Sequence, residues 1–216
     1  MAIYRDPRAP RVPTDHERRQ AEFVAAAGLV ILLKWLPPWA AIVLTAALAG
    51  YFAFASPRLF PATLRPDEVR QGYPVGKIAH AGMVFFLVLF FRHKLLVAAG
   101  AWAILAFGDA AATLAGSRWP LARHLWNREK TLGGTLAFLA AGGIAGFLAV
   151  WWVNYPPDPF PARFALLAAL PAAGIAAVVE SLPIPVEDNV TVPAVAAAFL
   201  ALFTHPYLLS LNHEIW

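Results

Sequence analysis

Long runs of apolar residues alternate along the chain with short polar segments. An α-helix needs about 17–25 mostly apolar residues to cross the hydrocarbon core of a bilayer. Two shorter runs, 21–36 and 78–91, have lysine or arginine near their ends, where long side chains can extend to the headgroups. The pattern therefore predicts an all-α, polytopic integral membrane protein with about seven transmembrane helices. The five longer runs are residues 35–57, 95–114, 131–153, 164–182 and 190–212.

The composition agrees with this prediction. Hydrophobic residues make up 60% of the chain and charged residues 14%, whereas about 25% of a typical soluble domain is charged. Pro37 and Pro38 divide the first apolar block into two helices, because proline cannot continue the interior of a helix. The chain has no cysteine, which excludes thiolate metal sites and thiol nucleophiles. We expect residues 1–19 to form a polar cytoplasmic tail and residues 20–216 to form a single transmembrane domain.

The basic residues are distributed unequally between the two sides of the membrane. Four of the 17 lie on one side, namely Lys34, Arg92, Lys94 and Arg163. The other thirteen lie in the tail and in the loops after the second and fourth helices, and the positive-inside rule places these segments in the cytoplasm. We therefore expect a multi-pass protein of the inner (cytoplasmic) membrane. The net charge of +4 would suggest nucleic acid in a soluble protein, but here the position of the charges matters more than their sum. The expected partner is therefore the lipid bilayer and not nucleic acid.

Several polar residues lie where the membrane makes them costly. Asp109 and Glu180 are the acidic residues of the five longer runs, and an ionised group inside a bilayer costs about 2.5–3.5 kcal/mol on insertion scales. Both lie near the cytoplasmic ends of their helices, as do His80 and the segment 187–189. This convergence predicts a polar site at the cytoplasmic face. Structural alternatives remain open: a buried ion pair for Asp109, a helix N-cap for 188–189, a hydrogen-bonded core position for His80, and lipid binding for the basic loop 118–130.

Helical spacing sharpens the expectation for Asp109. Residues 109, 112, 113 and 116 share one helix face, which is small and polar and would let a ligand approach the carboxylate. We expect Ala173, Ala176 and Ala177 to leave space in the same way beside Glu180. Gly142 and Gly146 form a GxxxG pair, which is typical of close helix packing within or between chains.

Four short blocks between about residues 70 and 200 match one family pattern. Residues 108–116 match GDxxA…G, residues 130–135 match KTxEG[ST], and Glu180 with residues 188–193 matches a late acid followed by a DNxTxP-like stretch. Residues 77–80 match an RKxxH element more weakly. The blocks resemble the membrane-bound lipid-alcohol kinases, which include dolichol kinase, phytol kinase and the CTP-dependent diacylglycerol kinase and are related to the CDP-diacylglycerol synthases. Gly133 stands where this family has a glutamate, for which the neighbouring Glu129 is a candidate substitute.

The resemblance implies phosphorylation of a membrane lipid alcohol by CTP with Mg²⁺ or another divalent cation. Phosphoryl transfer needs a metal, positive charge and positioning, and Mg²⁺ takes one or two carboxylates together with phosphate oxygens. The expected catalytic residues are Asp109, Glu180 and Asp188, with Asp109 and Asp188 as metal ligands and either Asp109 or Glu180 as proton acceptor. The expected nucleotide-binding residues are Lys130, Thr131, Arg123, Arg128, Arg118 and Lys77. Further polar candidates are His80, Thr113, Asn189 and Thr191.

Two other functions fit the same sequence. A cytidylyltransferase acting on a lipid phosphate would need the same metal and nucleotide but would release pyrophosphate. A non-catalytic scaffold or lipid carrier predicts that Asp109→Asn and Asp188→Asn leave function intact. The sequence leaves open the identity of the lipid alcohol (polyprenol, phytol-type alcohol or diacylglycerol), the choice between CTP and ATP, and the oligomeric state.

Overall fold

The computed structural model describes residues 15–154 and 161–213, and these residues form an all-α fold. Within these described ranges, five helices are long and apolar enough to cross a membrane: Pro38–Leu59, Leu95–Arg118, Leu132–Val153, Ala162–Ser181 and Asp188–His205. A shorter apolar helix covers Val75–Phe90. The prediction of an all-α polytopic membrane protein is confirmed. Of the expected polar tail, residues 1–14 lie outside the described residues.

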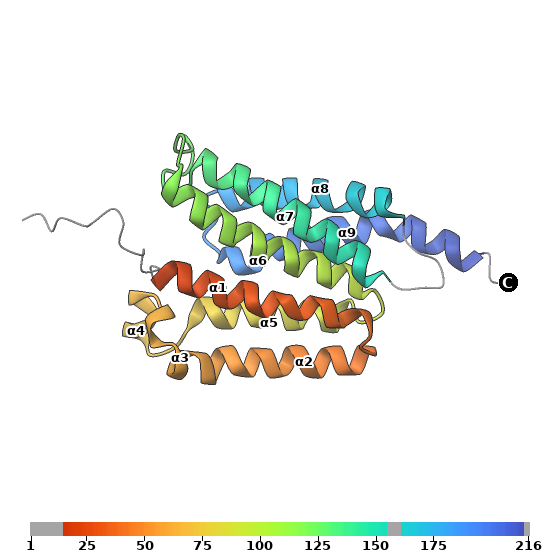
Figure 1. The fold of residues 1–216 in the computed structure, drawn as a ribbon, viewed down its shortest axis with the longest axis horizontal. Coiled ribbons are helices and arrows are strands. Elements are labelled where there is room, and N and C mark those ends of the chain that lie inside the picture. Colours follow the sequence, from red (N-terminus) through yellow and green to blue (C-terminus); the bar gives the residue numbers. More distant parts are fainter. Residues whose placement is uncertain (1–14, 155–160, 214–216) are drawn as a thin grey trace, which may run out of the picture.

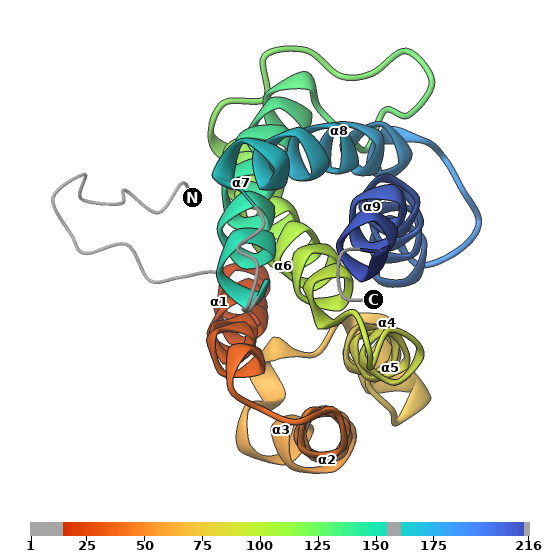
Figure 2. The same ribbon diagram turned by 90° about the vertical axis from the view of Figure 1, so that its right-hand side faces the viewer.

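The elements follow the predicted runs closely. They are α1 (Asp15–Ala27), η1 (Gly28–Lys34), α2 (Pro38–Gly50), η2 (Tyr51–Ala55), α3 (Ser56–Leu59), η3 (Pro61–Thr63), α4 (Pro66–Gln71), α5 (Val75–Phe90), α6 (Leu95–Arg118), α7 (Leu132–Val153), α8 (Ala162–Ser181) and α9 (Asp188–His213). The long helices run along one axis as a bundle (Figure 1). Viewed along that axis, α6 lies between α1, α7 and α9, with α2 and α5 on one side and α8 on the other (Figure 2).

Two helices differ from the simple prediction. The first begins at Asp15 instead of Ala21, so Arg18 and Arg19 belong to a helix and not to the tail. It continues from Gly28 as a 3₁₀-helix and ends at Lys34, before the proline pair that starts α2. The second long helix contains a π-helical turn at Tyr51–Ala55, which ends two positions before Pro57. Proline lacks the N–H needed to continue the α-helical hydrogen bonding.

Small residues bring α6 and α7 close together. A Cβ atom at Gly142 would lie 3.2 Å from the Ile104 carbonyl oxygen, and one at Gly146 would lie 2.6 Å from Ile104 Cγ1. The ring of Phe138 fills the space beside Gly108 in the same way. The GxxxG pair therefore serves helix packing within this chain, and α6 becomes the most enclosed of the candidate spans.

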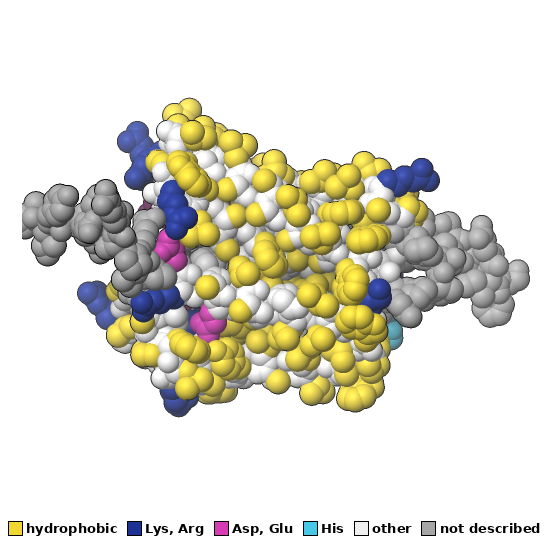
Figure 3. All heavy atoms as spheres, viewed as in Figure 1, with side chains coloured by type: hydrophobic (Ala, Val, Ile, Leu, Met, Phe, Trp, Pro, Cys, Tyr) yellow, Lys and Arg dark blue, Asp and Glu magenta, His cyan; other side chains and the backbone are white. Residues whose placement is uncertain are grey.

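The surface separates into an apolar middle and charged ends. On the face shown in Figure 3, hydrophobic side chains cover the middle of the bundle, and lysine and arginine gather at both ends of its long axis. Exposed tryptophans flank the same middle zone, with Trp35 and Trp39 where η1 meets α2 and with Trp119 and Trp126 in the loop between α6 and α7. This is the distribution that a bilayer favours.

Candidate functional site

A polar cavity of about 410 Å³ opens at one end of the bundle. Here α1, α7 and α9 begin and α6 and α8 end, so residues far apart in sequence meet (Figure 1). Seven of the predicted site residues line this polar cavity: Asp109, Thr113, Lys130, Thr131, Glu180, Asp188 and Asn189. The expected convergence of these seven residues on one face is therefore present.

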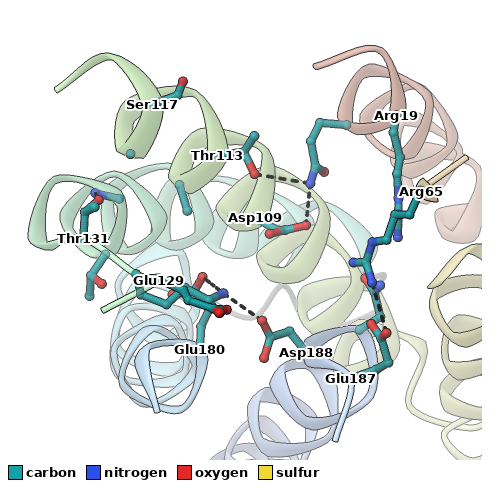
Figure 4. A pocket seen from close by; sticks show the side chains of 17 residues that line it. Arg19, Arg65, Asp109, Thr113, Ser117, Glu129, Thr131, Glu180, Glu187 and Asp188 are labelled. Carbon is teal, nitrogen blue, oxygen red and sulfur yellow. Dashed lines mark hydrogen bonds and ion pairs between the residues drawn. The ribbon is translucent and has the colours of Figure 1, made fainter. Parts of the chain in front are cut away.

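Lys130 connects two of the predicted acidic residues. Its Nζ atom donates to Asp188 Oδ2 at 2.7 Å and also contacts Glu180 Oε1 (Figure 4). Burial by itself would lower the pKa of Lys130, but the carboxylates of Glu180 and Asp188 raise it above its usual value. The side chain therefore stays positively charged at physiological pH and ties the end of α8 to the start of α9.

Local hydrogen bonds fix Lys130 in this position. The next residue, Thr131, is the N-cap of α7, and its side chain accepts a bond from the Gly134 backbone N–H at 3.1 Å. The loop before it folds back, because the His124 N–H donates to the Lys130 carbonyl at 3.2 Å. The His124 ring also meets the Thr135 hydroxyl, with 2.9 Å between Nε2 and Oγ1. The loop is thus held against the first turn of α7.

Asp109 lies on the opposite wall, on the helix face that its spacing predicted. Ala112, Thr113 and Gly116 line the polar cavity together with it. Gln20 Nε2 donates to Asp109 Oδ2 at 2.7 Å and lies 3.4 Å from Thr113 Oγ1. A side-chain amide from α1 therefore orients this carboxylate.

The alanines of α8 do not do what the sequence suggested. Ala173 and Ala176 are fully enclosed and Ala177 is 3% exposed, and all three pack in the hydrophobic core. None of them lines the polar cavity. Their small size lets neighbouring helices approach instead of clearing space for a ligand, as the 3.9 Å between a Cβ at Gly143 and that of Ala173 indicates.

The charge of the lining residues favours a cation. Five carboxylates (Asp109, Glu129, Glu180, Glu187 and Asp188) face three basic side chains (Arg19, Arg65 and Lys130). Among the described residues, no group of three or more His, Asp or Glu side chains is arranged to hold a metal ion. A divalent cation at Asp109 and Asp188 would therefore take further oxygens from water or a phosphate, as Mg²⁺ commonly does.

Two predicted residues lie in the interior, outside the polar cavity. Lys77 is fully buried, and its Nζ atom pairs with Glu22 Oε2 at 2.6 Å and contacts the hydroxyls of Ser56 and Thr63. His80 stacks on Phe23, with ring centroids 4.1 Å apart, and its Nδ1 atom is 3.3 Å from Asn189 Oδ1. These contacts favour the structural alternative for His80, a core histidine. The contacts of Lys77 hold α5 to α1, and Lys77 does not line the polar cavity where its predicted nucleotide contact would lie.

The other predicted basic residues, Arg118, Arg123 and Arg128, do not line the polar cavity. Arg118 pairs with Glu17 at 3.3 Å, and Arg123 donates to the Arg128 carbonyl at 2.5 Å. Arg128 lines an adjoining outer cavity of about 810 Å³, which shares Arg65, Glu129, Lys130, Glu187 and Asp188 with the polar cavity. Thr191 does not line either cavity, and its buried hydroxyl has no hydrogen-bond partner among the described residues.

Sequence reasoning missed part of the site. Arg19, Gln20 and Arg65 line the polar cavity, but all three lie before the first matched block, at residues 77–80. The signal in the sequence was an Arg-Arg-Gln run directly before the first apolar segment, which is equally typical of a polar tail. Only the packing of α1 against α6 turns this run toward Asp109.

The loop between α6 and α7 accounts for the glycine at position 133. A Cβ atom at Gly133 would overlap the Trp119 carbonyl oxygen, so the observed loop leaves no room for the glutamate of the family pattern. Glu129 lies on the same loop and lines the polar cavity. The cavity therefore has a carboxylate from the same loop, four positions before Gly133.

No protein-family model, no curated protein and no solved structure matches the chain. The kinase resemblance therefore depends on the sequence blocks described above, and the functional argument depends on the geometry of the cavity.

Proposed function

We propose that the protein transfers a phosphoryl group from a nucleoside triphosphate, CTP by resemblance, to the hydroxyl of a membrane lipid alcohol. The observation that carries this proposal is the meeting of three separate sequence blocks at one cavity. Asp109, Lys130 with Thr131, and Glu180 with Asp188 come from three blocks, and all five line the polar cavity. Carboxylates that hold a metal and a cation that meets phosphate oxygens are the parts that this chemistry requires.

The proposed reaction assigns a task to each group. The hydroxyl oxygen of the lipid attacks the terminal phosphorus, the bond from that phosphorus to the nucleoside diphosphate breaks, and the hydroxyl proton passes to Asp109 or Glu180. A divalent cation, held by Asp109 and Asp188, would offset the negative charge of the phosphates. Lys130 stays charged, and it would stabilise the phosphate oxygens while the carboxylates orient it.

A second cavity supports a lipid substrate. This apolar cavity of about 600 Å³ is lined by α1, η1, α6 and α7, including Ala27, Phe107 and Ala145. The helices α1, α6 and α7 also line the polar cavity. A hydrocarbon chain could lie between these helices while its hydroxyl end points to Asp109. The bias in basic residues supports a cytoplasmic position for the polar cavity.

The test is a reaction with the purified protein in lipid nanodiscs. We expect label from γ-³²P-CTP or γ-³²P-ATP to appear on a lipid alcohol when Mg²⁺ is present, with release of the nucleoside diphosphate. The panel should contain a polyprenol, phytol and diacylglycerol. Transfer of the nucleotide to a lipid phosphate with release of pyrophosphate would instead indicate a cytidylyltransferase.

Two variants separate catalysis from a scaffold role. Asp109→Asn and Asp188→Asn should each lower turnover by about 100-fold or more. Each change removes a carboxylate that would bind the metal, so the metal binds more weakly and stabilises the phosphate charge less. Arg70→Gln is the matched control, since Arg70 is exposed on α4 and does not line the polar cavity. Full activity in both asparagine variants would contradict the proposal.

A further inference from the structure

Arg19 is a buried cation with unused hydrogen-bond donors. Its side chain lies in the wall of the polar cavity and is 3% exposed. Within the described ranges, its Nε and Nη1 atoms have no hydrogen-bond partner. The neighbouring carboxylate of Glu68 is 3.8 Å from Nη1, which is too far for a hydrogen bond. Buried donors of this kind are normally paired with protein, water or a ligand.

Glu68 is already engaged by other donors. Its Oε2 atom accepts from the Arg65 backbone N–H at 2.9 Å, and its Oε1 atom accepts from the Gly76 backbone N–H at 2.7 Å. These bonds hold the start of α4 against the start of α5. The carboxylate therefore balances part of the charge of Arg19 without satisfying its N–H groups.

A second guanidinium stands beside Arg19. The side chains of Arg19 and Arg65 lie next to each other at the edge of the polar cavity, on the side away from Glu129 and Glu180 (Figure 4). Arg65 pairs with Glu187 at 3.0 Å and is 38% exposed. Like charges at close range repel, so an anion between them would stabilise the pair. A guanidinium matches phosphate well, because its planar N–H groups can bind two oxygens at once.

We propose that Arg19 and Arg65 form a phosphate-binding subsite at the edge of the polar cavity, opposite Lys130. Its ligand is a phosphate group, supplied by the nucleotide or by a phosphorylated lipid. The subsite includes no residue of the four sequence blocks. The inference builds on the proposed function, because it assigns a second phosphate contact in the same cavity, but it concerns binding and not turnover.

The binding test uses the full chain in phosphatidylcholine nanodiscs with Mg²⁺. Titration calorimetry would measure the affinity for CTP and for inorganic pyrophosphate, and a second series would use geranylgeranyl monophosphate incorporated in the discs. Arg19→Gln and Arg65→Gln should each weaken binding by about tenfold or more, as the loss of a charge-assisted hydrogen bond implies. If the two glutamine variants lose affinity for CTP and pyrophosphate, the subsite binds the nucleotide. If they lose affinity for the lipid phosphate alone, the subsite binds the lipid. Arg70→Gln should bind all three ligands as the wild type does.

Folding is measured alongside binding. The melting temperature of each variant without ligand shows whether the bundle is intact. If Arg19→Gln does not fold, Arg65→Gln decides, because Arg65 is partly exposed. Arg19→Lys keeps the charge and loses the planar fork, so it should bind more weakly than the wild type and more tightly than Arg19→Gln.

The outcomes separate this inference from the proposed function. Unchanged affinity for every ligand in folded Arg19→Gln and Arg65→Gln overturns the subsite, even if the wild type phosphorylates lipid alcohols. A wild type that binds none of the three ligands overturns it as well. Binding that depends on both arginines supports the subsite, even if the wild type transfers no phosphate.

Discussion

Gln20 shows how one side chain outside the recognised blocks can control a predicted catalytic group. It is 5% exposed, and its amide donates to Asp109 across the contact between α1 and α6. Its Oε1 atom has no hydrogen-bond partner among the described residues. The amide thus fixes one oxygen of Asp109 and presents an acceptor near the cavity, where a hydroxyl or water could donate to it.

Replacement of Gln20 by leucine tests this positioning role. Gln20→Leu keeps a similar volume but removes the donor to Asp109, and we expect turnover to fall by about tenfold or more, as is typical when a supporting hydrogen bond is lost. The rate should fall more than the affinity for nucleotide, because Asp109 would still be present but misoriented. Steady-state kinetics, with the melting temperature as a folding check, measure both.

The control for this change is Gln71→Leu, at the exposed end of α4. It should leave kcat and KM unchanged. Wild-type turnover in Gln20→Leu would show that Asp109 does not need this bond.

At the scale of elements, the helices α1, α6 and α7 connect the two proposed parts of the substrate site, the polar cavity and the apolar cavity. These helices line the polar cavity at the end of the bundle where α1 and α7 begin, and they line the apolar cavity farther along. The loop before α7 is held in place by hydrogen bonds, one at the Thr131 cap and one between the His124 ring and Thr135. A flexible lipid chain would thus lie along the helices, while the charged groups stay fixed by backbone contacts.

Filling the apolar cavity should weaken binding of the lipid alcohol and leave binding of the nucleotide unchanged. Gly28 lines this cavity, and a Cβ atom built there meets no atom within 4 Å, so Gly28→Leu places its Cβ in open space. We expect KM for the lipid alcohol to rise about tenfold, which corresponds to roughly 1.4 kcal/mol of lost binding. KM for the nucleotide should stay at its wild-type value.

Gly82→Leu on α5 is the matched control, because Gly82 also has open space around it and does not line the apolar cavity. If both leucine variants raise the lipid KM equally, the effect is general and the hydrocarbon chain does not bind between α1, α6 and α7.

For the whole molecule, the main prediction concerns orientation in the membrane. The polar cavity and the loop with Leu125 lie at one end of the bundle, and the turn with His93 between α5 and α6 lies at the other. The chain has no cysteine, so single cysteines can report the two sides without background. Leu125 is 93% exposed, and His93 is exposed as well.

We expect a membrane-impermeant maleimide to label His93→Cys on intact cells and to label Leu125→Cys only after the membrane is opened. The physical reason is the excess of lysine and arginine at the Leu125 end, which the positive-inside rule places in the cytoplasm. The reverse labelling pattern would place the polar cavity outside and remove its access to cytoplasmic nucleotide.

The sequence by itself determined the helices and the residues of each helix face. A membrane span requires about 20 apolar residues in a row and a helix face repeats every 3.6 residues, so both are local properties that can be read from the sequence. This is why the face with Asp109, Thr113 and Gly116 was predictable. The same local pattern could not tell whether Lys77 faces a ligand or the partly buried Glu22, because that depends on the partner helix.

The tertiary structure alone decided which segments complete the site. Arg19 looks like the end of a polar tail, and Gln20 looks like the residue before the first apolar run, until α1 packs against α6. Arg65 reaches the polar cavity only through the fold of the segment before α4. Likewise, the space at Gly133 depends on the Trp119 carbonyl fourteen positions earlier in the chain. Such contacts join residues far apart in sequence, and their geometry is set by how whole helices pack, which no short pattern encodes.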